Sequence, residues 1–137
     1  AVARLTIDLD NPQAVITLRY DVMAQYMQSL RQIYREEAGK LKASLDAKSL
    51  KALKRWLARD AEDLPEQERQ RYVAALEKSS RLSLGVEMRR ELVSLWQRST
   101  ATHEELLARL QDWCRRAEAS GIRQLEEFSS RLRSYAL

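Results

Sequence analysis

The sequence predicts an all-α protein, an antiparallel bundle of five or six helices with a short extended N-terminal lead-in. Three observations predict it. Apolar residues recur every three or four positions over most of the chain, which is the period of one helix face. Three glycines and two prolines among 137 residues are too few for an all-β or loop-rich fold. A composition that is 45% hydrophobic and 32% charged favours a folded domain over a disordered chain.

Residues 1–10 are predicted to form the extended lead-in, because apolar and polar residues alternate strictly from Leu5 to Leu9. Residues 11–137 are predicted to form a single helical bundle domain, since a chain of 137 residues suits one domain.

The first helix is predicted to begin at Asn11 and Pro12, because Asn caps a helix and Pro fits its first position. An apolar stripe that starts at Val15 and continues to Leu45 extends this helix to about residue 43. Gly39 is its weak point, since glycine is a poor helix former.

The second helix is predicted over residues 46–59, with Asp46 or Ser49 near its N-cap. Its apolar face consists of Leu50, Leu53, Trp56 and Leu57. Pro65 opens the next helix after an acidic loop. One long helix is predicted from there to about residue 98, with a break at 79–85, where serines and Gly85 weaken the apolar period.

The last two helices are predicted to meet in a hairpin. Thr102 and Glu105 form a capping box before the first of them. Its apolar face is Leu106, Leu110, Trp113, Cys114 and Ala117. Gly121 ends it, because glycine enters the left-handed conformation at least cost. Ile122, Leu125, Phe128, Leu132 and Tyr135 then restart the helical period.

Few residues in the sequence have the spacing that catalysis needs. His103 is the single histidine, and the residue three positions before it is Thr100 rather than the Glu of a di-iron helical bundle. Cys114 is the single cysteine, and its place on an apolar face favours a buried structural thiol, although Arg115 and Arg116 leave a reactive one open. No catalytic, cofactor-binding or metal-binding residue is assigned, and catalysis by this chain alone is not expected.

A local excess of positive charge stands out in a chain with a formal net charge of +4. Five basic residues crowd one side of the second predicted helix: Lys48, Lys51, Lys54, Arg55 and Arg59. They are either a plain solvated face or a docking surface for anionic lipid headgroups or nucleic-acid phosphate.

Three ordered stretches carry a resemblance to a known family. They are Arg19-Tyr20-Asp21-Val22-Met23-Ala24-Gln25-Tyr26, then Leu76-Glu77-Lys78-Ser79 through Met88-Arg89-Arg90-Glu91-Leu92 to Leu95-Trp96, then Trp113 followed by Ala117-Glu118-Ala119-Ser120-Gly121-Ile122, Leu125, Phe128, Leu132 and Tyr135. In this order they resemble the C-terminal cytosolic extension of bacterial aerobic fatty-acid (acyl-CoA) desaturases.

The resemblance implies a non-catalytic domain in unsaturated fatty-acid biosynthesis, on the cytoplasmic side of the inner membrane and tethered to it. Its partner would be an upstream membrane domain of the same protein, which would hold the di-iron cofactor, so this chain itself would hold none. The basic side of the second helix would face an anionic lipid surface. Self-association is left open.

Two alternatives are kept. The pattern Trp113, Ser120-Gly121, Leu125, Phe128, Leu132 and Tyr135 also looks like the helical region of insertion-sequence transposases with an Asp/Asp/Glu catalytic set. That reading implies nucleic acid as the partner, and the catalytic Glu, which lies in an Asn-rich segment after this region, is not placed in this sequence. The other alternative is a free-standing helical interaction module.

Overall fold

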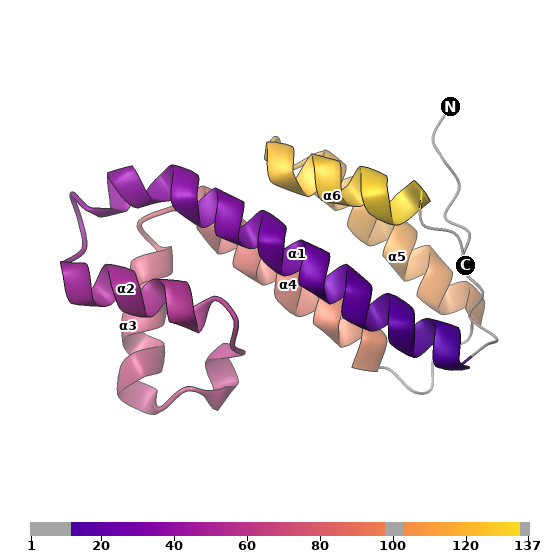
Figure 1. The fold of residues 1–137 in the computed structure, drawn as a ribbon, viewed down its shortest axis with the longest axis horizontal. Helices are drawn as coiled ribbons and strands as arrows, with labels where there is room; N and C mark the ends of the chain where they lie inside the picture. The colour runs from indigo at the N-terminus through magenta and orange to yellow at the C-terminus, as the bar shows by residue number, and fades with distance from the viewer. Residues whose placement is uncertain (1–11, 98–102, 135–137) are drawn as a thin grey trace. The chain divides into compact units, whose positions relative to one another are not determined.

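The computed structural model describes residues 12–97 and 103–134, and every regular element in these ranges is a helix (Figure 1). The elements are α1 (Pro12–Leu41), α2 (Ala47–Trp56), the short 3-10 helix η1 (Ala61–Asp63), α3 (Glu66–Leu76), α4 (Ser80–Gln97), α5 (His103–Glu118) and α6 (Arg123–Ser134). The prediction of an all-α fold is confirmed. The predicted lead-in at residues 1–10 and the capping residue Thr102 lie outside the described residues.

The chain divides into two compact units. Unit 2 is the continuous stretch Leu30–Glu87, and unit 1 is made of the residues on either side of it, up to Ser29 and from Met88 onward. The single domain predicted over residues 11–137 is not decided by this division and stays a prediction.

Unit 1 is built around the hairpin of α5 and α6, which lie side by side in Figure 1. Gly121 joins the two helices with a φ of 74°, the left-handed conformation predicted for it. The core of the unit is an aromatic cluster in which Tyr26, Trp113 and Phe128 meet edge to face, with ring centroids 5.0 to 5.9 Å apart. The indole N–H of Trp113 donates a hydrogen bond of 2.9 Å to the carbonyl oxygen of Met88.

In sequence order, unit 2 contains the last turns of α1, then α2 and α3, then the first turns of α4. Trp56 of α2 packs against Tyr72 of α3 with ring centroids 5.8 Å apart. The hydroxyl of Tyr34 on α1 donates to the carbonyl oxygen of Leu50 on α2 at 3.0 Å. These contacts fix the faces that α2 and α3 turn inward.

The helix ends in unit 2 differ from the predicted ones in two places. α2 begins after Asp46, whose carboxylate accepts from the backbone N–H of Ser49 at 2.7 Å, and it ends at Trp56 rather than residue 59. The N–H of Arg59 donates to the carbonyl oxygen of Trp56 in a closing turn, so Arg59 lies just beyond the helix.

The predicted break at 79–85 is the second difference. The chain breaks at 77–79, where the Ser79 hydroxyl accepts from the N–H of Leu82 and caps α4. Gly85 lies inside α4, and a Cβ added to it would stand 2.9 Å from the Leu30 Cδ1. Gly85 is therefore a point of close packing and not the end of a helix.

Among the described helices, none combines the length and the apolarity that crossing a bilayer requires.

Candidate functional site

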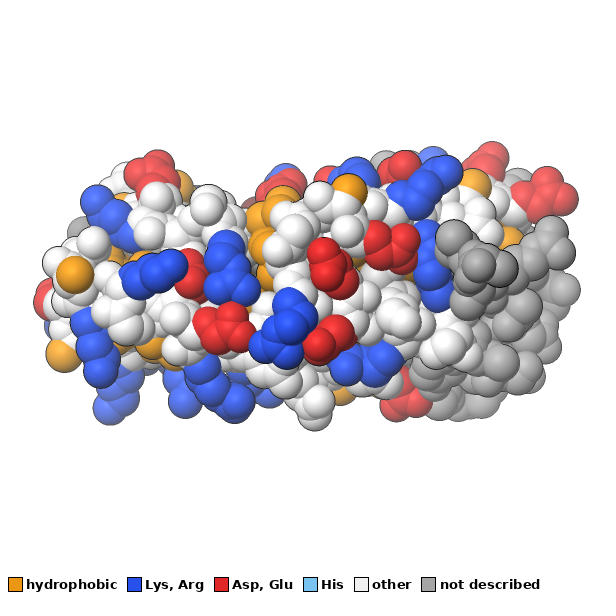
Figure 2. Space-filling model, turned by 90° about the horizontal axis from the view of Figure 1, so that it is seen from above, with side chains coloured by type: hydrophobic (Ala, Val, Ile, Leu, Met, Phe, Trp, Pro, Cys, Tyr) orange, Lys and Arg blue, Asp and Glu red, His pale blue; other side chains and the backbone are white. Residues whose placement is uncertain are grey.

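The five basic residues predicted on the second helix are all exposed in the structure. We call Lys48, Lys51, Lys54, Arg55 and Arg59 the basic face of α2. They are turned outward because Ala52, Leu53 and Trp56 bury the opposite side of the helix. Lys48, Lys51 and Arg55 follow one another at spacings of three and four residues, which makes them neighbours on a helix surface. Figure 2 shows Lys and Arg side chains gathered over the part of the chain where α1 ends and α2 follows.

Helix α3 adds one acidic and one basic side chain beside this face. The Glu68 Oε1 accepts from the indole N–H of Trp56 at 3.4 Å and lies 3.7 Å from a guanidinium nitrogen of Arg55. The guanidinium carbon of Arg71 lies 5.4 Å from the Trp56 ring centroid. Arg71 also donates to the Ser49 hydroxyl at 3.1 Å.

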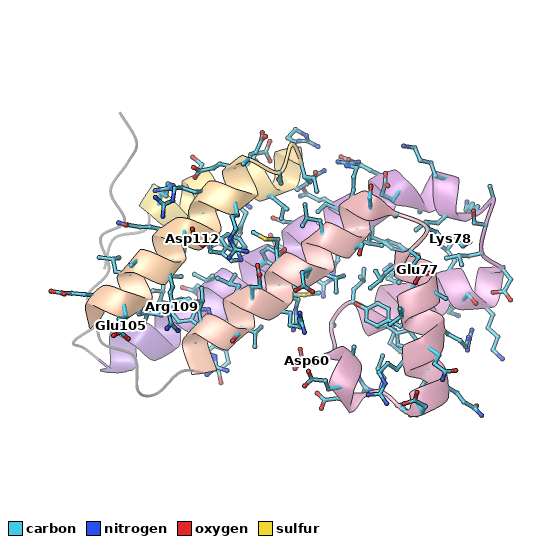
Figure 3. All side chains as sticks on the ribbon, turned by 180° about the vertical axis from the view of Figure 1, so that it is seen from behind. Asp60, Glu77, Lys78, Glu105, Arg109 and Asp112 are labelled. Carbon is cyan, nitrogen blue, oxygen red and sulfur yellow. The ribbon has the colours of Figure 1, made fainter. Side chains whose placement is uncertain are left out.

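Acidic residues stand at both ends of α2. Hydrogen bonds from Ser49 hold the pKa of the Asp46 carboxyl below its usual value, and the charges of Arg71 and Lys48 lower it further. Asp46 therefore stays ionised at neutral pH as the N-cap. Asp60, labelled in Figure 3, follows the C-terminal end of α2 and leads into η1. The basic face is thus bounded along the chain by negative charge.

Arg71 was missed in the sequence analysis. It is separated from Ser49 by 22 residues, and only the packing of α3 on α2 brings it to that position. The one available signal was its place directly before Tyr72, because a residue next to a buried aromatic position on a helix lies near the edge of the buried face.

The remaining residues weighed for chemistry do not form a site with one another. Cys114 has no exposed surface, and burial raises the pKa of its thiol, which disfavours the reactive thiolate. His103 begins α5, but its side chain is not among those described. Glu104 and Glu105 are exposed, and Figure 3 shows Glu105 with Arg109 and Asp112 along α5.

Two ionic clusters hold elements together within their own units. In unit 2, the Glu37 carboxylate accepts from the Ser79 hydroxyl at 2.7 Å and from Arg81 at 3.3 Å, which ties α1 to the start of α4. In unit 1, Glu118 accepts from Arg133 and Ser129, each at 2.6 Å, which closes the hairpin. These hydrogen bonds also lower the pKa of Glu118.

Within residues 12–97 and 103–134, no three His, Cys, Asp or Glu side chains come close enough to hold a metal ion. The absence of a cofactor in this chain stays a prediction. The strongest remaining candidate for a site is the basic face of α2 with Arg71 beside it.

Comparison with known proteins identifies a family for this chain. The model of the transposase family DDE_Tnp_ISL3 matches residues 6–137, nearly the whole chain. No curated protein and no solved structure matches.

This match overturns the resemblance to fatty-acid desaturases, together with the role in lipid metabolism and the place beside the inner membrane that it implied. An upstream di-iron membrane domain and a lipid surface lose their support as partners. The resemblance was wrong because its first two stretches lie mainly in the amphipathic helices α1 and α4, whose apolar period many helical proteins share. The third stretch, from Trp113 onward, is the one that also pointed to transposases. The chain belongs to the transposase family.

Proposed function

We propose that this chain is the helical part of an insertion-sequence transposase that holds duplex DNA through the basic face of α2, and that it contributes no catalytic residue of its own. One observation carries the proposal: in a member of a transposase family, five basic side chains stand exposed on one helix and the turn after it.

The chemistry of this face suits the DNA backbone. Lysine and arginine neutralise phosphates and release the counterions condensed on the duplex. From Lys48 to Arg55 the face extends about 10 Å along the helix at 1.5 Å per residue. A duplex presents several phosphates over such a length. Binding is therefore expected to be strongly dependent on salt and largely independent of base sequence.

Glu68 works against DNA binding at this face. Its carboxylate lies 3.7 Å from Arg55, so it competes with phosphate for that guanidinium. Glu68→Gln keeps an oxygen that accepts from the Trp56 indole but removes the charge. This variant is expected to bind DNA more tightly, whereas loss of basic residues is expected to weaken binding.

The test measures binding of the whole chain to a labelled 30-base-pair duplex by fluorescence anisotropy over a range of salt concentrations. The triple variant Lys51→Glu, Lys54→Glu and Arg55→Glu is expected to weaken binding at least tenfold at low salt. Five phosphate contacts would give a slope of log K against log salt of about −4.5 for the unaltered chain. The triple variant is expected to have a shallower slope.

The matched control makes three charge reversals at exposed residues that are not part of the basic face: Lys78, Arg115 and Arg123. It changes the net charge of the chain equally, so it separates a local contact from a general attraction between DNA and a basic protein. Equal losses of binding in the two triple variants would refute the proposed interface, as would a triple variant that binds like the unaltered chain.

A further inference from the structure

Arg71 is held by two contacts on α2 rather than by its own helix. Its guanidinium lies over the Trp56 ring, 5.4 Å from the centroid, and one of its nitrogens donates to the Ser49 hydroxyl at 3.1 Å. Trp56 is a firm support because it is only 1% exposed and is itself fixed by Glu68 and Tyr72. An exposed arginine is thereby kept in a narrow range of positions.

These two contacts also locate Arg71 relative to the basic face. Ser49 and Trp56 are seven residues apart, so they lie on the same side of α2, two turns apart. Each directly follows a member of the basic face, Lys48 in one case and Arg55 in the other. Neighbouring residues on a helix diverge by about 100°, so Arg71 lies at the edge of the buried side of α2 and borders the row that Lys48 and Arg55 form. The charge of Arg71, like that of Lys48, lowers the pKa of the Asp46 carboxyl, which agrees with this position.

We infer that Arg71 is a further phosphate-binding residue and that the DNA-binding surface spans both α2 and α3. This inference rests on the proposed function. A guanidinium carries five N–H donors in a fixed fork, and the Ser49 hydroxyl occupies only part of that capacity. The guanidinium over the Trp56 ring is positioned in advance, so little freedom is lost when a phosphate binds.

The competing explanation is that Arg71 only joins α2 to α3, as a cation over an aromatic ring. Two substitutions separate the explanations. Arg71→Gln removes the charge and keeps a polar but shorter side chain. Arg71→Lys keeps the charge but loses the guanidinium that lies over Trp56.

A role in phosphate binding predicts that Arg71→Gln makes the slope of log K against log salt shallower by about 0.9. A variant that binds like the unaltered chain at 1 M salt would then bind about eightfold more weakly than it at 0.1 M salt. Arg71→Lys is expected to have the same slope as the unaltered chain. The measurement is again anisotropy with the 30-base-pair duplex, and circular dichroism checks that each variant is folded. Arg69→Ala is the matched control, since Arg69 lies on the same helix and pairs with Glu66. It is expected to leave the slope unchanged.

The outcomes distinguish this inference from the function on which it rests. If Arg71→Gln has the slope of the unaltered chain while the triple variant of the basic face loses binding, the inference is wrong and the proposed function stands. If Arg71→Gln and Arg71→Lys weaken binding alike, Arg71 is only a link between helices. If the triple variant also binds normally, the proposed function itself fails.

Discussion

Single residues in unit 1 show how the hairpin acquires its stability. Trp113 has no exposed surface, packs edge-on against Tyr26 and Phe128, and satisfies its indole N–H at the Met88 carbonyl. Burial also raises the pKa of Tyr26, so its hydroxyl stays neutral at ordinary pH. The cluster therefore joins α1, α4, α5 and α6 within one unit through uncharged side chains.

Trp113→Ala should lower the free energy of unfolding by about 3–5 kcal/mol, the usual cost of truncating a buried tryptophan. Urea unfolding measures this loss. Arg115→Ala, two residues along the same helix at a side chain that is 70% exposed, serves as the control and should change the free energy by less than about 0.5 kcal/mol. Similar shifts in the two variants would contradict the burial of Trp113.

Two glycines show how elements differ in their tolerance of one methyl group. Both Gly39 and Gly85 lie within helices, α1 and α4. A Cβ at Gly39 would meet nothing within 4 Å, whereas a Cβ at Gly85 would stand 2.9 Å from Leu30 and 3.4 Å from Ile33. The two positions therefore share the helix preference for alanine but differ in the space around them.

Gly39→Ala should stabilise the protein by about 0.5–1 kcal/mol, because alanine has a lower conformational entropy in the unfolded chain and a higher helix propensity. At Gly85 the same gain is offset by crowding, which typically costs about 1–3 kcal/mol. Gly85→Ala should therefore be less stable than Gly39→Ala by at least about 1 kcal/mol. Thermal or urea unfolding of the pair measures the difference, and equal stabilisation would show that α4 does not pack tightly at Gly85.

The elements also show what the sequence could predict and what it could not. The apolar period predicted where the α-helices run, because the same period is what a helix buries, but it did not predict η1, which falls in the expected acidic loop. It misplaced the break between α3 and α4, because Gly85 is a poor helix former whose presence is explained by Leu30, a contact between distant residues. For the same reason, spacing on one helix predicted the basic face of α2 but not Arg71, which arrives from α3.

At the scale of the whole molecule, the division into two units does not coincide with the ends of helices. α1 begins in unit 1 and ends in unit 2, and α4 begins in unit 2 and ends in unit 1. Unit 2 could unfold alone only if both helices broke in their interiors. Such a break would leave backbone groups at new helix ends without helical partners. Continuity of the two helices therefore favours one cooperative domain.

Single-tryptophan variants test this cooperativity. In a Trp96→Phe background, a further Trp113→Phe leaves Trp56 as a probe of unit 2, and Trp56→Phe leaves Trp113 as a probe of unit 1. In each variant the urea transition seen by fluorescence should superimpose on the one seen by far-ultraviolet circular dichroism, which reports all the helices together. Each variant is its own control, because the comparison is made within one protein. A Trp56 transition that precedes the loss of helix would mean that unit 2 unfolds by itself and that residues 11–137 are not a single domain.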